Sequence, residues 1–570
     1  MRRVVPFVVL VGLLAASGVS GGQTVLTERE IDVKGRYLLV PVNKKATANP
    51  FRSVANTLQQ TLDVYVDGVL VHSPNVDLAH KKADIAFWGQ LDLSGYVGKK
   101  ARLRLRVLND KAKRAVPAHS KALEMIDTGD TPRDIEPLYK ERLRPLLHFS
   151  QMRGWNNDTN GMLYYDGEYH LFWQANPVGL QHGNMYWGHA VSTDLVHWKE
   201  LPEALRPFAM GCKNAHPAMA IGRCHSGGGT VDHNNTGGWQ TGRDKVLLLT
   251  FTDTTNTRGR QRNLPGFQES IAYSTDKGRS WRIWEGSPII KHVGRDPKLF
   301  WYEKGKHRLI HGPVYAGQCF SNAPDGRVIY MGWVRGLTLP GMPITQGFTL
   351  PIELTLTETP AGVRMYGYPA KEVDTLRDEL LYRSTGAMLA AGQTLEFATD
   401  REAADILLTV RPAPGARELN LRIGDTRIGY DFKTAKTLPF SGNRKRKKQG
   451  DAAPVALRDG KLYLRVVVDR STAEVFYNNG EVYALRKRNT PRIGTVTLEA
   501  EGMIVDFRAY GMKSIWQRPG VESHPSAARA RRPRGPHPPR PAGAPARAST
   551  NAGDVPESPL SRLLGRAVRP

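Results

Sequence analysis

The chain has 570 residues, of which 40% are hydrophobic, so it is long enough for about three domains and apolar enough to exclude a wholly disordered protein. Glycine (56) and proline (38) are abundant and long helical periodicities are scarce, which favours short strands and turns. The formal charge of +26 is concentrated partly in the run 444–448 and in residues 517–570, where ten arginines face three acids. No recognition helix or RNA-binding motif organises this charge, so the sequence predicts no nucleic-acid partner.

Residues 1–22 are predicted to be a signal peptide. Two arginines precede an apolar stretch at 4–16, and the small residues Gly18 and Ser20 suit a signal peptidase. The stretch is too short to cross a bilayer comfortably. We therefore expect a secreted protein, extracellular or periplasmic, with no membrane insertion after signal removal. An uncleaved anchor is the alternative.

Residues 23–140 are predicted to form a small N-terminal β-sandwich. Strands are expected at 37–42, 62–71 and 101–107, and Asp67-Gly68 between alternating apolar residues predicts a hairpin turn. In an exported protein such an accessory domain could bind carbohydrate or serve as a packing module, and the sequence leaves both readings open.

Residues 141–350 contain repeated patterns that predict a β-propeller. In each repeat, aromatic strands and a turn lead to Ser-Thr-Asp and then to tryptophan, which is typical of four-stranded blades. The paired segments are 188–198 with 271–281, and 163–170 with 299–307. Chance similarity between β-hairpins is the alternative.

Residues 351–516 are predicted to form a C-terminal β-sandwich. The segments 462–469 and 473–477 alternate as strands do, and Asn478-Asn479-Gly480 then predicts a hairpin turn. Residues 517–570, rich in arginine, proline and alanine, cannot build a core and are predicted to be disordered.

The strongest candidate for a catalytic motif is the segment Trp155-Asn156-Asn157-Asp158-Thr159-Asn160-Gly161. Its acid is flanked by amides that can keep it ionised, and it stands near an aromatic side chain that can contact a sugar. Retaining glycosidases need two carboxyl groups about 5 Å apart, one as nucleophile and one as acid. An ordinary turn is the structural alternative for this motif.

Together with further motifs, this segment resembles glycoside hydrolase family 32, the family of levanases, inulinases and invertases. The resemblance runs from about 144 to 512. It rests on motifs at 148–149, 155–161, 172–177, 187–190, 225–227, 234–237, 251–253, 295–298, 315–318 and 331–333. It implies an all-β fold in which a five-bladed propeller is followed by a β-sandwich. The first domain resembles an accessory module found ahead of some bacterial levanases.

The resemblance also implies roles for individual residues. Asp158 would be the nucleophile and Asp296 a transition-state stabiliser that holds fructose hydroxyls, with Arg295 beside it. A buried ion pair is the alternative for Arg295 and Asp296. The first fructose pocket would be lined by Trp155, Asn157, Gln174, Trp187 and Ser226. The substrate would be a fructan or sucrose, and the two-carboxylate mechanism needs no cofactor and no metal.

One family signature has no counterpart in this sequence. The Glu-Cys pair followed by Pro-Asp, which supplies the general acid, is not found. The expected inner strands lie near Asp158, Gly228, Asp296 and Tyr315, at steps of 70, 68 and 19 residues. A blade needs about 40 to 50 residues, so we expect about one blade to be deleted. Glu303, the only glutamate in the last gap, is expected in an outward-pointing turn.

Three readings stay open. The first is β-fructosidase activity impaired by loss of the acid, and the second is a non-catalytic fructan-binding protein derived from such an enzyme. An arabinan- or xylan-acting hydrolase on a related propeller is the third. The sequence does not predict the oligomeric state, the preferred substrate among levan, inulin and sucrose, or endo versus exo action.

Overall fold

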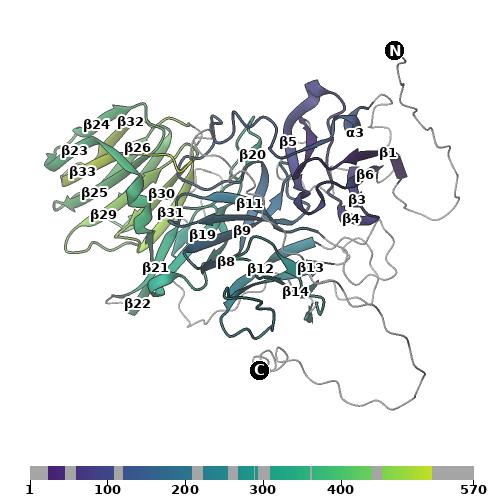
Figure 1. Cartoon of the computed structure of the whole chain (residues 1–570). Coiled ribbons are helices and arrows are strands. Elements are labelled where there is room, and N and C mark those ends of the chain that lie inside the picture. Colours follow the sequence, from purple (N-terminus) through teal and green to yellow (C-terminus); the bar gives the residue numbers. More distant parts are fainter. Residues whose placement is uncertain are drawn as a thin grey trace, which may run out of the picture.

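The computed structural model describes most of the chain between residues 24 and 516. Its described ranges are 24–44, 60–107, 120–207, 223–254, 267–287, 289–292, 309–359, 362–439, 452–488 and 490–516. The predicted signal peptide and tail, the basic run 444–448, Glu303, and the pair Arg295 and Asp296 lie outside them. Sheets of the N-terminal region, in purple, and of the C-terminal region, in green, flank a central group of sheets (Figure 1).

The N-terminal region forms two antiparallel sheets that pack face to face. One has the order β1-β6-β3-β4, with bounds β1 (Thr24–Asp32), β6 (Lys100–Val107), β3 (Gln60–Val66) and β4 (Val69–His72). The other has the order β5-β2-β7, with bounds β5 (Ile85–Asp92), β2 (Tyr37–Asn43) and β7 (Asp127–Gly129). The predicted hairpin is confirmed, because Asp67 and Gly68 join β3 to β4 with positive φ angles of 51° and 78°.

Short helices are few in the described part of the chain. They are α3 (Ala122–Met125), η2 (Lys82–Asp84), η3 (Ser94–Tyr96), η4 (Pro324–Gly326) and η5 (Lys371–Leu376). Within the described ranges, no helix has the length and apolar character needed to cross a bilayer.

The central region forms three propeller-type sheets among the described residues. The first has the order β11-β10-β9-β8-β20, with bounds β8 (Gly154–Tyr165), β9 (Glu168–Asn176), β10 (Tyr186–Ser192), β11 (Lys199–Leu205) and β20 (Ile344–Thr345). The second comprises β12 (Arg223–Asp232), β13 (Val246–Thr254), β14 (Phe267–Ser274), β15 (Arg282–Ile283) and β16 (Ile290–His292). The third comprises β18 (Val314–Cys319), β19 (Val328–Val334), β21 (Ile352–Thr359) and β22 (Gly362–Pro369).

One predicted pair of repeats, 188–198 with 271–281, is confirmed by matching hydrogen bonds in the first two sheets, whereas residues 299–307 of the other pair lie outside the described residues. The Ser192 hydroxyl donates to Asp194 (3.0 Å), as the Ser274 hydroxyl does to Asp276 (2.7 Å). In each sheet the tryptophan that follows donates its indole N–H to a turn carbonyl, at 2.9 Å for Trp198 and 3.1 Å for Trp281. The same sequence pattern therefore builds the same local structure twice.

The innermost strands β8, β12 and β18 lie directly against one another. Gln318 donates its side-chain N–H to the Gly227 carbonyl (3.0 Å), and the Ser321 hydroxyl donates to the Gly229 carbonyl (2.9 Å). A Cβ atom on Gly229 would lie 2.1 Å from the Gly161 carbonyl oxygen, so only glycine permits this approach. The second and third described sheets thus meet at their inner strands, as expected for a propeller shortened between them.

The C-terminal region is a β-sandwich of a seven-stranded and a five-stranded sheet. Their orders are β17-β31-β30-β29-β25-β33-β23 and β24-β32-β26-β27-β28. The bounds are β17 (Ile310–His311), β23 (Arg377–Leu389), β24 (Thr394–Thr399), β25 (Ala404–Pro412), β26 (Glu418–Ile423), β27 (Thr426–Asp431), β28 (Lys436–Thr437), β29 (Leu462–Val468), β30 (Thr472–Tyr477), β31 (Val482–Lys487), β32 (Gly494–Glu499) and β33 (Met503–Met512). The predicted turn after β30 is confirmed by positive φ at Asn478, Asn479 and Gly480.

A buried histidine joins the propeller to this sandwich. His148 Nδ1 lies 2.7 Å from an oxygen of Asp469, and its Nε2 lies 2.9 Å from an oxygen of Glu474. All three side chains are at most 1% exposed. Burial opposes a charge on the ring, but the hydrogen bonds to the two carboxylates prevail and raise the pKa of His148 to about 9.

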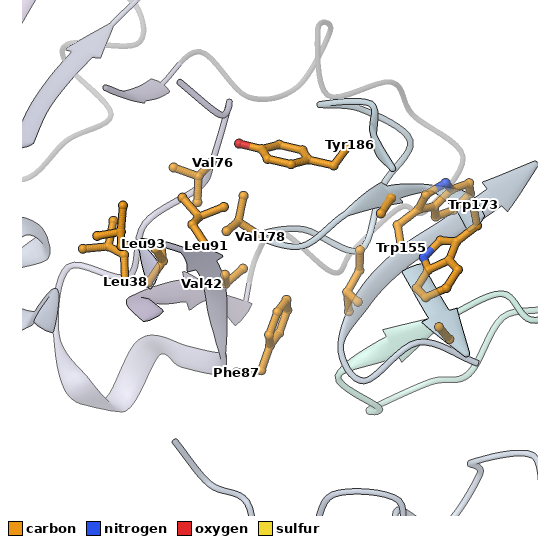
Figure 2. Close-up of a cluster of buried hydrophobic side chains, with 14 of the residues drawn as sticks. Leu38, Val42, Val76, Phe87, Leu91, Leu93, Trp155, Trp173, Val178 and Tyr186 are labelled. Carbon is orange, nitrogen blue, oxygen red and sulfur yellow. The ribbon is translucent and has the colours of Figure 1, made fainter. Parts of the chain in front are cut away.

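The N-terminal sandwich packs against the first propeller sheet. Figure 2 shows Phe87 and Leu91 of the sandwich beside Val178 and Tyr186 of the propeller, and these residues belong to one hydrophobic cluster. His72 also lies within hydrogen-bond distance of the Tyr186 hydroxyl (3.2 Å). The two regions therefore share a core.

Candidate active site

Each of the three innermost strands is irregular at the same end of the propeller sheets. The register shifts between Asn156 and Thr159 where β8 meets β9, and between Cys224 and Gly227 where β12 meets β13. A third shift occurs where β18 meets β19, just after Tyr315. Such bulges re-aim side chains and often occur beside active sites.

The bulges in β8 and β12 bring Asp158 and Ser226 together. The Ser226 hydroxyl donates a hydrogen bond to Oδ2 of Asp158 over 2.9 Å. Asp158 is partly exposed, whereas Ser226 is 6% exposed. A carboxylate that accepts a hydrogen bond on one oxygen and still reaches solvent is suited to nucleophilic attack.

Trp155 and Asn157 lie beside Asp158 on β8. The Trp155 indole N–H donates to the Asn157 side-chain oxygen (3.0 Å), and the two residues are 3% and 5% exposed. This hydrogen bond fixes the amide orientation, so that its N–H₂ group is left to donate elsewhere.

Gln174 and Trp187 hold the bulge of β12 from behind. Gln174 donates to the Cys224 carbonyl (2.9 Å), and the Trp187 indole N–H lies 3.2 Å from the carbonyls of both Cys224 and His225. Gln174 is 1% and Trp187 0% exposed. Their observed contacts position the backbone that carries Ser226.

The strand β18 forms another wall of this region. The Thr159 hydroxyl donates to the Ala316 carbonyl (3.0 Å), which ties β8 to β18. Tyr315 is 57% exposed, and its ring centroid lies 6.2 Å from that of Trp333, which in turn lies 6.2 Å from Trp155. Both Tyr315 and Trp333 occur in motifs of the sequence resemblance, but the sequence did not mark them as site residues.

Two buried carboxyl groups at the same end were also missed by sequence reasoning. Asp253 accepts a hydrogen bond from Gln268 (3.0 Å), and Glu269 accepts one from Thr252 (2.6 Å). Burial raises the pKa of Asp253 to about 6, with Glu269 adding to the effect and the Gln268 hydrogen bond opposing it. Phe251-Thr252-Asp253 is one of the matched motifs, but only tertiary structure shows that its acid is buried.

The remaining predicted site residues, Arg295 and Asp296, lie outside the described residues, so their roles stay predictions. The whole sequence contains no Glu-Cys pair. In the described part of the chain, no side chain is identified as the general acid.

Two family models match successive parts of the chain. The "Glycosyl hydrolases family 32 N-terminal domain" matches residues 148–314, and the "Glycosyl hydrolases family 32 C terminal" domain matches residues 372–486. The first match contains Asp158 and Ser226, and the second contains the two carboxylates that bind His148.

Curated relatives include two bacterial levanases. That of Bacillus subtilis (strain 168) is 30% identical over 464 residues, covering 60% of this chain and 66% of the levanase. That of Bacillus sp. (strain L7) is 26% identical over 511 residues, covering 66% of this chain and 53% of the levanase. The chain therefore spans between about half and two thirds of these proteins. An extracellular exo-inulinase of Aspergillus awamori is 35% identical over 188 residues, covering 30% of this chain and 34% of the inulinase.

Solved structures show the same fold. The exo-inulinase from Aspergillus awamori superposes with a TM-score of 0.56 at 21% identity, covering 66% of this chain and all of that one. A glycoside hydrolase family 32 protein from Bifidobacterium adolescentis gives a TM-score of 0.54 at 17% identity, covering 86% of this chain and all of that one. With both family models matched in order, the chain belongs to glycoside hydrolase family 32.

Proposed function

We propose that this protein hydrolyses β-fructofuranosidic bonds in fructans or sucrose by a retaining mechanism, with Asp158 as the nucleophile. The observation that carries the proposal is the hydrogen bond from Ser226 to a partly exposed Asp158 at the bulged ends of the inner strands. The levanase and inulinase names of curated relatives support the substrate class.

In the first step, an oxygen of Asp158 attacks the anomeric carbon of fructose while the glycosidic bond to the leaving oxygen breaks. The product is a fructosyl ester of Asp158, which water then hydrolyses. Ser226 stabilises the ionised carboxylate before attack. We propose that Trp155 and Asn157 line the pocket, and that Asp296 and Arg295 hold fructose hydroxyls as charge develops on the ring.

Proton donation to the leaving oxygen is the step for which no residue is assigned among the described ones. General acid catalysis contributes about a hundred- to ten-thousand-fold. A leaving group that departs without a proton, such as fluoride, does not require this help. The proposal therefore predicts slow cleavage of natural fructans and efficient cleavage of β-fructosyl fluoride.

The test measures fructose release by the purified chain from levan, inulin and sucrose, and fluoride release from β-fructosyl fluoride. Asp158→Asn should abolish release from all four. A matched control is Asp166→Asn, since Asp166 is a surface acid paired with Lys277. Release that persists in Asp158→Asn would overturn the assignment of the nucleophile.

A second candidate function is fructan binding without hydrolysis. Its support is the direct contact of β12 with β18 through Gln318 and Gly227, where the expected intervening blade would separate them. This reading predicts that the wild-type chain binds levan but releases no fluoride from β-fructosyl fluoride. Fluoride release that depends on Asp158 would exclude it.

We also propose that the protein is secreted. The pattern of residues 1–22 supports this, as does the extracellular exo-inulinase among the relatives. Expression of the full chain followed by N-terminal sequencing of the exported product tests it. Retention of an intact N-terminus in the cell membrane would contradict it.

A further inference from the structure

A cavity of ≈ 60 Å³ lies between the N-terminal sandwich and the first propeller sheet. The sandwich contributes Tyr37 from β2 and Gln90 from β5, and the propeller contributes Trp173 from β9 together with Glu200 and Glu203 from β11. Interfaces between domains are common places for small-molecule sites.

The cavity lies on the opposite face of the first sheet from Asp158. Neighbouring residues of a strand point to opposite faces. On β9, Trp173 lines the cavity while Gln174 binds the Cys224 carbonyl behind Ser226. On β10, Tyr186 lines the cavity while Trp187 binds the same carbonyl. The sheet therefore separates two distinct sites.

Several polar groups of the cavity wall are fixed by hydrogen bonds. Glu200 accepts one from the Met152 backbone N–H (2.6 Å), and Glu203 accepts one from the Asp92 backbone N–H across the domain interface (3.2 Å). Gln151 accepts one from the Trp173 indole N–H (2.7 Å). The wall is thus preorganised, which lowers the entropy cost of binding.

Other polar groups have no partner within the described residues. The Gln90 side-chain oxygen is buried and accepts no hydrogen bond there. The Tyr37 hydroxyl and the second oxygen of Glu200 likewise have no hydrogen bond to the described protein. Acceptors outnumber donors in this set, so a ligand with several hydroxyl groups would satisfy it.

The carboxyl groups of the cavity wall are only partly charged. Burial raises the pKa of Glu200 to about 7 and also raises the pKa of Glu203, so both groups hold a proton over part of the neutral range. Arg153 lines the cavity beside them. Carboxyl groups that are partly protonated can both donate and accept hydrogen bonds, which suits the hydroxyl groups of a neutral ligand.

The volume limits the ligand to a small unit. A water-sized group needs about 10–15 Å³ of cavity volume, so the cavity takes about four to six such groups. That is about one edge of a sugar ring with its hydroxyls. Tyr37 and Trp173 supply apolar surface for the ring carbons.

We propose that this cavity is a second carbohydrate site, which binds one neutral sugar unit by its hydroxyl-rich edge. The identification of that unit as fructose, either free or at the end of a fructan chain, rests on the proposed function. The site would place a sugar between the N-terminal sandwich and the sheet that supports Asp158.

The test measures fructose binding by ligand-observed NMR in the full chain carrying Asp158→Ala and Ser226→Ala. These two substitutions remove polar groups of the candidate active site and so weaken fructose binding there. We expect fructose binding to persist in this background. Tyr37→Phe and Glu200→Gln should each weaken it about three- to tenfold, the effect of losing one hydrogen bond. Glu285→Gln, which changes an exposed carboxyl group in the turn after β15, is the matched control and should leave binding unchanged.

The proposal would be overturned if the Asp158→Ala, Ser226→Ala protein bound no fructose. It would also be overturned if adding Tyr37→Phe or Glu200→Gln left fructose binding as strong as in that protein. Phe retains the ring of Tyr37, so the Tyr37→Phe variant should fold. A melting temperature equal to that of the parent protein checks this. Binding of fructose but not of a fructan oligosaccharide would assign the site to the free sugar, and binding of both to a chain end. Fructose release by the wild-type chain is scored separately, so failure of hydrolysis leaves this result intact.

Discussion

The Ser226 hydroxyl donates a 2.9 Å hydrogen bond to Oδ2 of Asp158, although the two residues are 68 positions apart. The contact exists because β8 and β12 each bulge at the same end of their sheets. It places a donor on one carboxylate oxygen and leaves the residue partly exposed. The chemistry of the site depends on this pairing.

Ser226→Ala removes that donor. A hydrogen bond to a charged group contributes about 1.5–3 kcal/mol, so we expect kcat/KM for β-fructosyl fluoride to fall about ten- to a hundredfold. Ser280→Ala, a change in an exposed turn of the second sheet, is the control. Unchanged kcat/KM in Ser226→Ala would show that the contact does not serve the reaction.

Trp187→Phe removes the indole N–H that holds the Cys224 and His225 carbonyls. We expect kcat to fall several-fold because Ser226 is less well fixed. The free energy of unfolding should fall by about 1–3 kcal/mol, since buried carbonyls lose a donor. Trp198→Phe loses a comparable turn hydrogen bond away from the site and is the comparison. An equal loss of kcat in both variants would contradict a positioning role for Trp187.

The His148 cluster predicts a pH dependence of stability. The pKa of His148 is raised from 6.5 to about 9, because its hydrogen bonds to Asp469 and Glu474 outweigh the opposing effect of burial. The folded state therefore binds more protons than the unfolded state between these values. The contribution of His148 to the free energy of unfolding is complete below pH 6.5 and is lost as pH rises through about 9.

Urea unfolding from pH 6 to 9 measures this dependence. His148→Gln should remove the slope and cost about 3–5 kcal/mol at pH 6, because two carboxylates stay buried without a cation. His197→Gln is the control, since His197 pairs with Asp194 at the surface. An unchanged slope in His148→Gln would assign the pH dependence to other groups.

Asp253 predicts a second dependence at lower pH. Burial raises its pKa from 3.8 to about 6, so the folded state holds the proton in this window and stability falls as pH rises through it. Asp253→Asn keeps an acceptor for Gln268 and removes the charge. We expect the variant to have a higher melting temperature than the parent at pH 7.5 and a similar one at pH 4. A lower melting temperature at pH 7.5 would contradict this account.

Local signals predicted much of this fold. The hairpins at Asp67-Gly68 and Asn478-Asn479-Gly480 follow from turn residues that tolerate positive φ. The repeated Ser-Thr-Asp turns follow from side chains that bind their own backbone. These contacts are encoded within a few residues, so a sequence pattern reveals them.

Long-range contacts could not be predicted in this way. The predicted place of Gln174 and Trp187 in the fructose pocket stays a prediction, and no local pattern indicated their hydrogen bonds to the backbone that carries Ser226. The contact of Gln318 with Gly227 and the cavity beside Glu200 depend on which sheets meet in space. Asp253 looks like any strand-end acid until its burial is known.

The most direct test of the central claim is to trap the fructosyl ester on Asp158. β-Fructosyl fluoride needs no acid for the first step, whereas hydrolysis of the ester needs a base. The ester should therefore accumulate in acid-quenched samples. Peptide mass spectrometry is predicted to find one fructosyl unit on the peptide that contains Asp158, and none in Asp158→Asn. An unmodified Asp158 peptide despite fluoride release, or a fructosyl unit on another residue, would contradict the account.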